Sequence, residues 1–320
     1  MRVLLRSLAA AVAAVWLAAP AMAADYPARD IDLVVPYKPG GAVDTTSRIL
    51  AESAKRVLKG HEITVVNKDG GGGVVGQAFV SKARPNGYTI LAFTNSAVSN
   101  PLLKGAPFAV SDFTPIGLYT LDPEVIAVPA ASPYKTIAEF MAAAKAGNLK
   151  IVSSGSGTSH HMAGLALELG SGVTFTYVFV RGFGEEMQAM IGNHVDGAFW
   201  PFGIAKQQAA SGAIRILAIA SEEPMPGFET VPTWKAANLG VESWQTFRGW
   251  AAPKGTPKAV IDRLSGLLKT IDGDPAYRSK MEKAGYPLVY RDSAGFAKIV
   301  AEEDAVIRRL IKEKGLKPKK

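Results

Sequence analysis

Short apolar segments alternate with longer amphipathic ones through the first third of the chain. The apolar segments 31–37, 63–67 and 88–94 are predicted to be buried strands, and the segments 44–58 and 74–83 between them have the spacing of helices. Strands and helices that alternate in this way form a parallel sheet with right-handed crossovers. We therefore expect an α/β unit at the start of the chain.

A second α/β block follows the first. Thr136 and Glu139 have the spacing of a capping box, which predicts a helix from there to about Gly147. Further helices are expected over 185–191 and 204–210. The strands expected in this block are 125–128, 150–153, 174–180, 195–200 and 214–220.

The last third of the chain is predicted to be mainly helical. Thr256-Pro257 and Asp274-Pro275 each place a capping residue before a proline, an order that favours a helix start. The segment 293–314 has apolar residues at helical spacing, which indicates one or two amphipathic helices. Residues 222–246 are rich in Pro, Gly and Glu and are interpreted as a crossover between domains. The expected lobes are 24–124 with 247–320 for the first, and 125–246 for the second.

The first residues have the pattern of a secretory signal peptide. Arg2 and Arg6 precede an apolar run over 8–19, and Ala21-Met22-Ala23 fits a cleavage site. Residues 1–23 are therefore expected to be removed, leaving a periplasmic protein. The chain has no cysteine, which excludes a disulfide framework.

The net charge favours an anionic ligand over a nucleic acid. The formal charge is +8, and several of the surplus lysines lie near the C-terminus. No basic patch alternates with aromatic residues as in proteins that bind single strands, so no nucleic-acid partner is expected. A mildly positive field would attract a small anion. The protein is expected to act as a monomer.

Two glycine turns carry the most specific chemistry in the sequence. Gly40 and Gly41 follow the first predicted strand, and the run 70–76 follows the second. Both turns precede a predicted helix, and glycine leaves the N–H groups of a helix N-terminus open to an anion. Successive parallel strands end at one edge of a sheet, where ligands bind in open α/β folds. The turns are therefore predicted to converge on one anionic ligand, such as a carboxylate.

Nucleotide and metal chemistry are not supported. The run 71–76 formally matches a dinucleotide fingerprint, but no Asp or Glu follows it before Asp112 to hold a ribose. The chain has no P-loop motif. It has four histidines, no cysteine and no H-E-x-x-H motif, which argues against a zinc site. No cofactor and no metal are expected.

The turn 154–158 supplies hydroxyl and N–H groups at another helix start. A serine hydrolase would need a G-x-S-x-G elbow, and no serine has glycines at both spacings. A secreted hydrolase-like enzyme that uses Ser156 or His161 is kept as an alternative, although His161 is expected to pack or bond locally. Asp44 is expected to cap a helix. Arg181 is equally compatible with a salt bridge and with a carboxylate fork.

A series of short motifs follows one order along the chain. They are Tyr26-Pro27 with 31–37, Pro39-Gly40-Gly41 with Asp44, Asn67-Lys68 with 70–76, Gly87-Tyr88-Thr89, Asn100-Pro101, 154–157 with His161, Arg181-Gly182, Gly192 with Val195-Asp196, Val231-Pro232-Thr233, and Ala252-Pro253 with Gly255-Thr256-Pro257. In these motifs the chain resembles the Bug-type extracytoplasmic solute receptors, the substrate-binding proteins of tripartite tricarboxylate transporters. The resemblance covers nearly all of the chain after residue 23.

The resemblance implies a type II periplasmic-binding-protein fold, with two α/β lobes around a ligand cleft. It implies a receptor, not an enzyme, that closes over a small carboxylate and delivers it to membrane components of a tripartite tricarboxylate transporter or to a sensor. A di- or tricarboxylate or an aromatic acid is expected. The residues predicted to bind it are Tyr37, Gly40, Gly41, Asp44, Gly72, Gly73, Ser96, Ser156, Gly157, Thr158, Arg181 and Trp200.

Departures from the family pattern cluster in the expected second lobe. The segment 179–182 replaces a common Pro-Tyr-Lys-Gly stretch, and Glu185 lies in a segment that usually lacks this acid. Trp200 stands where a smaller or acidic residue is frequent. The far end of the ligand is therefore expected to be unusual, aromatic or apolar. A receptor for an amino acid remains an alternative, which Asp44 or Glu185 facing an ammonium group would support.

Overall fold

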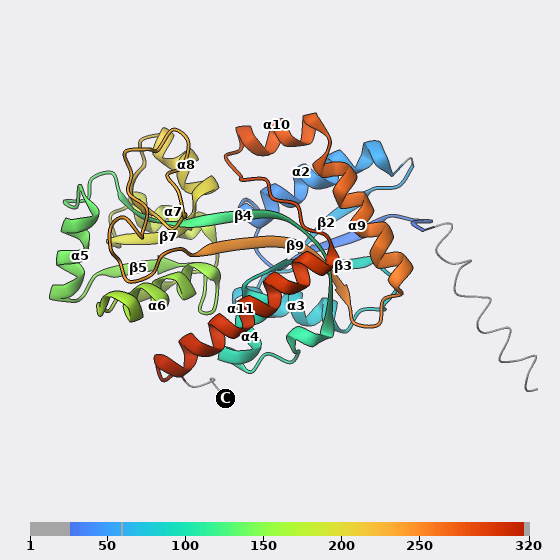
Figure 1. The fold of residues 1–320 in the computed structure, drawn as a ribbon, viewed down its shortest axis with the longest axis horizontal. Coiled ribbons are helices and arrows are strands. Elements are labelled where there is room, and N and C mark those ends of the chain that lie inside the picture. Colours follow the sequence, from blue (N-terminus) through green and yellow to red (C-terminus); the bar gives the residue numbers. More distant parts are fainter. Residues whose placement is uncertain (1–25, 59, 317–320) are drawn as a thin grey trace, which may run out of the picture.

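The computed structural model describes residues 26–58 and 60–316, so the expected signal peptide lies outside the described residues. Within these ranges the strands form one nine-stranded sheet in the order β2-β1-β3-β9-β4-β7-β5-β6, with β8 also paired to β4. Figure 1 shows two α/β lobes joined by the long strands β4 and β9. The expected class of fold, two lobes around a cleft, is confirmed.

The first lobe contains the predicted parallel sheet. Strand β1 pairs in parallel with both β2 and β3. The strands are β1 (Ile31–Val35), β2 (Ile63–Asn67) and β3 (Thr89–Thr94). The helices are α2 (Ala42–Val57), α3 (Val74–Ser81), α4 (Ser96–Lys104), α9 (Lys258–Asp272), α10 (Pro275–Lys283) and α11 (Ser293–Glu313), with short 3₁₀ turns η1 (Gly71–Gly73) and η2 (Val110–Asp112).

Two long strands connect the lobes, β4 (Phe113–Pro129) and β9 (Gln245–Pro253). They run antiparallel to each other, and β4 changes partner after Pro123, pairing from Glu124 onward with β7 and β8 of the second lobe. This change lies beside the expected lobe boundary, whose exact position stays a prediction. The sequence interpretation was incomplete here, because it began the strand of β4 only at residue 125 and named no strand where β9 lies.

The second lobe has a parallel core and antiparallel neighbours. Strand β5 pairs in parallel with β6 and β7. The strands are β5 (Lys150–Ser153), β6 (Thr176–Phe179), β7 (Gly197–Pro201) and β8 (Ile214–Ile219). The helices are α5 (Ile137–Ala146), α6 (Ser159–Ser171), α7 (Phe183–Ile191) and α8 (Phe202–Ala210). The predicted capping box of α5 is confirmed, since Thr136 and Glu139 each bond the other's backbone N–H.

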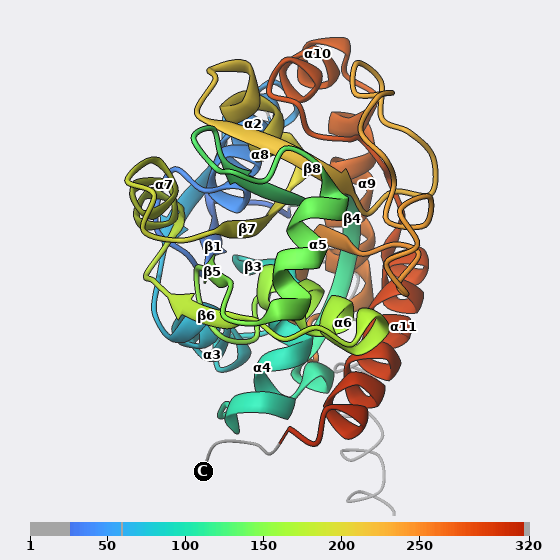
Figure 2. The ribbon, with the colours of Figure 1, turned by 90° about the vertical axis from the view of Figure 1, so that its left-hand side faces the viewer.

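The C-terminal helix α11 packs on both lobes. Phe296 and Val300, near its start, belong to an apolar core of the first lobe. Ile307 and Leu310, about two to three turns further on, belong to the core of the second lobe. Figure 2 shows this end of α11 beside α6. None of the helices in the described ranges has the length and apolar content needed to cross a membrane.

Candidate functional site

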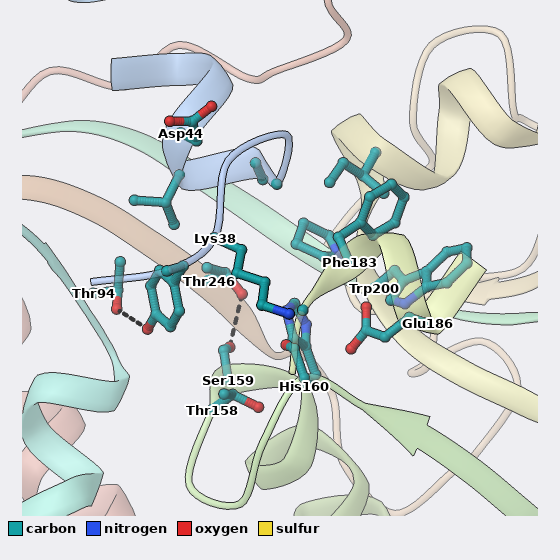
Figure 3. Close-up of a pocket in the computed structure, with 18 of the residues that line it drawn as sticks. Lys38, Asp44, Thr94, Thr158, Ser159, His160, Phe183, Glu186, Trp200 and Thr246 are labelled. Carbon is teal, nitrogen blue, oxygen red and sulfur yellow. Dashed lines mark hydrogen bonds between the residues drawn. The ribbon is translucent and has the colours of Figure 1, made fainter. Parts of the chain in front are cut away.

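A pocket of about 80 Å³ lies where the two lobes meet. The loop between β1 and α2 forms one wall, and the starts of α6, α7 and α8 form the opposite wall (Figure 3). A water molecule needs about 10–15 Å³ of cavity measured in this way. The pocket therefore has room for several water-sized groups, which suits a small organic acid.

Two helix N-termini without side-chain caps face this pocket from opposite lobes. Helix α2 begins after Gly41 and α7 begins after Gly182, and neither N-cap residue makes a side-chain capping bond. Gly41 and Gly182 both line the pocket. The first N–H groups of a helix are its positive end and bind anions. Gly41 thus directly precedes a helix N-terminus that faces a cavity, as the sequence predicted.

The helix starts of α6 and α8 also lie in the wall but are already paired. Thr158 caps α6 by accepting a hydrogen bond from the N–H of His161. In α8, the N–H of Gly203 donates to the Asp122 carboxylate at 3.2 Å. These two helix ends position side chains around the pocket, while those of α2 and α7 leave N–H groups for a ligand.

The carboxylate of Asp44 is held inside the first lobe. It is the third residue of α2 and not its N-cap, which corrects the expected role. The carboxylate accepts hydrogen bonds from the Gly40 N–H at 3.0 Å and the Asn67 amide at 2.9 Å, and Arg48 forms an ion pair with it at 2.9 Å. Burial opposes its charge, but the hydrogen bond from Arg48 holds the pKa of Asp44 below its ordinary value. Asp44 therefore lines the pocket without a free oxygen to offer an ammonium group.

Tyr37 is fixed beside the pocket by two hydroxyl groups. Its hydroxyl lies 2.9 Å from Thr94 Oγ1 and 2.5 Å from Ser96 Oγ. Burial raises the pKa of Tyr37, so the phenol stays neutral. Ser96 does not line the pocket itself, and its role there is to hold Tyr37.

Buried charge pairs lie on the strands that cross between the lobes. Arg248 of β9 contacts Asp122 of β4 at 3.0 Å, and both side chains are almost fully buried. Burial raises the pKa of Asp122 to about 6, although Arg248 acts in the opposite direction. Arg248 also lines the pocket, so one positive charge in its wall is already balanced.

A second pair joins β4 to α6. His160 Nδ1 lies 3.2 Å from Glu124 Oε2, and the Thr246 hydroxyl donates to the other oxygen of Glu124. Burial opposes both charges, but each partner favours the charge of the other. The pKa of Glu124 is therefore lowered and that of His160 is raised. This pair leaves His160 with a matched charge at the pocket wall.

Glu186 is a site residue that the sequence analysis missed. It lies in the first turns of α7, is 1% exposed and lines the pocket between His160 and Trp200 (Figure 3). Burial raises its pKa, while the nearby charge of His160 acts in the opposite direction. The helical spacing of Glu186 and Met190, both on the buried face of α7, was the one signal available in the sequence.

The second glycine turn lines a different cavity. Gly72, Gly73 and Ser156 line a neighbouring cleft of about 550 Å³, which shares Tyr37, Ser154 and Arg181 with the pocket. That both turns converge on one ligand stays a prediction. A Cβ atom on Gly155 would be only 3.1 Å from Gly72 Cα. Gly72 has φ of +64°, which glycine adopts easily. These glycines let the two lobes touch.

Lys38 and Glu185 form an ion pair between the lobes. Lys38 Nζ lies 2.9 Å from Glu185 Oε1, and both side chains are about 40% exposed, at 39% and 41%. The other carboxylate oxygen of Glu185 accepts a hydrogen bond from the N–H of Arg181 at 2.9 Å. Glu185 is thus paired rather than facing the pocket. Arg181 lines both the pocket and the neighbouring cleft.

The other predicted residues divide between the pocket and its supports. Thr158 and Trp200 line the pocket, and the Trp200 ring packs edge-on against Phe183 with centroids 5.3 Å apart. Gly40 and Gly157 line neither cavity. The N–H of Gly157 instead donates to His161 at 3.1 Å.

His161 has a structural environment. Its ring lies edge-on to Tyr177 and Phe179, with centroids 4.7 and 5.1 Å away, and Nδ1 accepts the N–H of Gly157. Burial lowers the pKa of His161 to about 4. The expectation that His161 packs and bonds locally is confirmed. Among the described residues, no group of three or more His, Asp or Glu side chains is placed to hold a metal ion.

Comparison with known proteins identifies the family. Residues 46–316 match the family model described as tripartite tricarboxylate transporter family receptor. The chain belongs to this family. It is 33% identical over 326 residues to the UPF0065 protein in the gbd 5'region of Cupriavidus necator, a match that covers 95% of each chain. Bug-type receptors are thus the group that the sequence motifs indicated.

Solved structures agree with this assignment. The periplasmic binding protein BugD is 28% identical, with a TM-score of 0.85 over 92% of this chain and 100% of its own. A TctC solute binding protein from Polaromonas is 30% identical, with a TM-score of 0.69 over 90% of this chain and 99% of its own. These relatives are binding proteins and not enzymes, so the hydrolase alternative is set aside. The chain is therefore a solute-binding protein of this receptor family.

Proposed function

We propose that this receptor captures a small carboxylate between its lobes outside the cytoplasmic membrane and delivers it to a tripartite tricarboxylate transporter. The single observation that carries the proposal is the pair of uncapped helix N-termini, from α2 and α7, that face one small pocket. Each offers backbone N–H groups to an anion. Because they come from opposite lobes, an anion that bridges them would favour lobe closure.

The proposed ligand-binding residues combine backbone and side-chain groups. Backbone N–H groups at the start of α2 would hold the carboxylate, and apolar side chains would contact the ligand carbons. The pocket-lining members of the predicted set are Tyr37, Gly41, Asp44, Thr158, Arg181 and Trp200, to which Lys38, Ser154, Phe183 and Glu186 are added. Gly72, Gly73 and Ser156 are proposed to support closure instead.

Compartment and assembly are proposed from the sequence. The pattern of residues 1–23 supports export and cleavage, which would place the receptor in the periplasm. We expect the monomer to meet the membrane components of the transporter. A role in signalling through a sensor would use the same capture step.

The proposal is tested by removing one N–H group from the site. Ala42 is the first residue of α2, a position where proline is tolerated because its φ fits a helix start. Isothermal titration calorimetry would compare succinate, malate, butyrate and benzoate with their amides for wild type and Ala42→Pro. Wild type should bind acids and not amides. The variant should bind acids about tenfold or more weakly, since a hydrogen bond to a charged group contributes about 1.5–3 kcal/mol.

Lys258→Pro is the matched control. Lys258 is the first residue of α9, its side chain is 85% exposed, and it does not line the pocket. This variant should melt near the temperature of Ala42→Pro and keep wild-type affinity. Equal binding of acids and amides, or an unchanged affinity in a folded Ala42→Pro protein, would contradict the proposal.

A further inference from the structure

One carboxyl group in the pocket has no counter-charge bonded to it. Glu186 is 1% exposed, and its Oε1 is buried without a hydrogen-bond partner among the described residues. The neighbouring acid, Glu185, is by contrast bonded to Lys38 and to the N–H of Arg181. Burying a carboxyl oxygen without a hydrogen bond costs free energy. Glu186 lines the pocket, so a bound molecule could supply the missing hydrogen-bond donor.

The groups around Glu186 do not satisfy it. His160, the nearest cationic ring, is already paired with Glu124 at 3.2 Å. The indole Nε1 of Trp200 is buried and also lacks a partner in the described part of the structure. Ser154 and the Trp200 indole both lie close enough to Glu186 to favour its charged form, but neither meets Oε1 with the geometry of a hydrogen bond. This side of the pocket therefore has one open acceptor, while the start of α2 has open donors.

We propose that Glu186 makes this receptor selective for carboxylates that also carry a hydrogen-bond donor, either a hydroxyl or an ammonium group. The inference rests on the proposed function, because it assigns the second group of a ligand whose carboxylate binds at α2. The pocket of about 80 Å³ suits a short acid. The donor would meet Oε1 of Glu186, and the aromatic faces of Phe183 and Trp200 would contact the carbons between the two groups.

The expected selectivity follows from the cost of an unmade bond. A donor to a charged acceptor contributes about 1.5–3 kcal/mol, which corresponds to about tenfold to hundredfold in affinity. An acid that lacks the donor would not form this hydrogen bond, and it would also leave Oε1 of Glu186 buried without a partner. Both effects would weaken its binding relative to that of a donor-bearing acid. An ammonium group would also supply the positive charge that favours ionised Glu186, whereas a hydroxyl would supply only the hydrogen bond.

Matched ligand series test the inference. Calorimetry would compare succinate, malate and aspartate, and separately butyrate, 4-hydroxybutyrate and 4-aminobutyrate, in which hydrogen is replaced by hydroxyl or ammonium on one skeleton. In wild type at least one donor-bearing member should bind tenfold or more tightly than its parent acid. Glu186→Ala should reduce that ratio to threefold or less.

A second variant separates the two donors. Glu186→Gln keeps an acceptor oxygen and removes the charge, so a hydroxyl preference should persist while an ammonium preference is lost. Glu185→Gln is the matched control. It makes the same change one residue away, on an acid that pairs with Lys38. It should change the affinities for all the acids by a similar factor, so the ratio between each donor-bearing acid and its parent acid should stay the same. Circular dichroism and melting curves of each variant establish that it is folded.

The outcomes separate this inference from the function on which it rests. Parent acids that bind as tightly as their donor-bearing partners would overturn the role of Glu186 and leave the carboxylate receptor standing. Ratios unchanged in folded Glu186→Ala would do the same. Acids that bind no better than their amides, in both series, would overturn the carboxylate receptor together with the inference.

Discussion

Buried His161 should make the stability of the receptor depend on mildly acidic pH. Its side chain is 9% exposed, and burial lowers its pKa to about 4. In the unfolded chain a histidine titrates near pH 6.5. Between these values the unfolded chain binds more protons than the folded one, so the contribution of His161 is complete above about pH 6.5 and is lost as the pH falls toward 4.

The size of the effect follows from the two pKa values. Lowering the pH from 7.5 to 5 should reduce the free energy of unfolding by about 2 kcal/mol through His161 alone, because one pKa unit corresponds to about 1.4 kcal/mol. His161→Asn keeps an oxygen that can accept the N–H of Gly157 and does not titrate. Other groups titrate equally in both proteins, so the difference between the two isolates His161.

Urea unfolding at pH 5, 6 and 7.5 measures this difference. Wild type is expected to lose stability relative to His161→Asn by about 2 kcal/mol across the range, with most of the change below pH 6.5. A difference in the free energy of unfolding between the two proteins that stays constant with pH, measured on folded samples with equal m-values, would refute the argument. It would mean that His161 is protonated in the fold despite the hydrogen bond that Nδ1 accepts.

Three further predictions concern stability and use urea unfolding at pH 7.5. Asp122→Asn leaves buried Arg248 without its counter-charge and should cost about 3–5 kcal/mol, much of which the double variant with Arg248→Met should restore; a single-variant loss below about 1 kcal/mol would contradict the pairing. Thr136→Ala removes the cap of α5 and should cost about 1 kcal/mol, whereas no change would show that the cap contributes nothing. Gly249→Ala would place a Cβ atom 2.3 Å from the ring of Phe296, so a loss of at least about 1–3 kcal/mol is expected, and wild-type stability would show that this contact relaxes freely.

Periodicity in the sequence was sufficient to locate most elements of both lobes. The strands 63–67 and 150–153 were predicted with the bounds that the structure has. Buried parallel strands form short apolar runs whatever their partners are, so a local pattern identifies them. Pro275 after Asp274 likewise marked the start of α10, because capping depends only on neighbouring residues.

The strands that cross between the lobes could not be found in this way. Strand β4 contains Asp122 and Glu124, and β9 contains Arg248, all of them almost fully buried. Charged residues of this kind normally indicate an exposed segment, since burying an unpaired charge is costly. Their partners lie far away in sequence, with Asp122 and Arg248 separated by 126 positions. Only tertiary structure shows that these charges are matched.

The same limit applies to the two glycine turns. Both turns follow strands of one parallel sheet, and the sequence cannot give the order of those strands. In the structure β2 is the outermost strand of the first lobe, so the turn after it lies beside a neighbouring cleft, while the turn after β1 reaches the pocket. The place of each turn along the edge of the sheet therefore depends on the strand order, which only the tertiary structure gives.

The distribution of charge around the pocket restricts how an acid can lie in it. Each other buried carboxylate in or beside the wall has a cation of its own, the pairs being Asp44 with Arg48, Asp122 with Arg248, and Glu124 with His160. These pairs cancel locally, so the field that a ligand meets comes mainly from the open ends of α2 and α7, from Arg181 and from Glu186. Burial raises the pKa of Glu186, and a ligand carboxylate placed against it would raise that pKa further, because two like charges repel in a low-dielectric site. If a dicarboxylate is the ligand, the proposed site would direct its second carboxylate toward the start of α7, which would leave the contact with Glu186 to a hydroxyl or ammonium group on the carbons between.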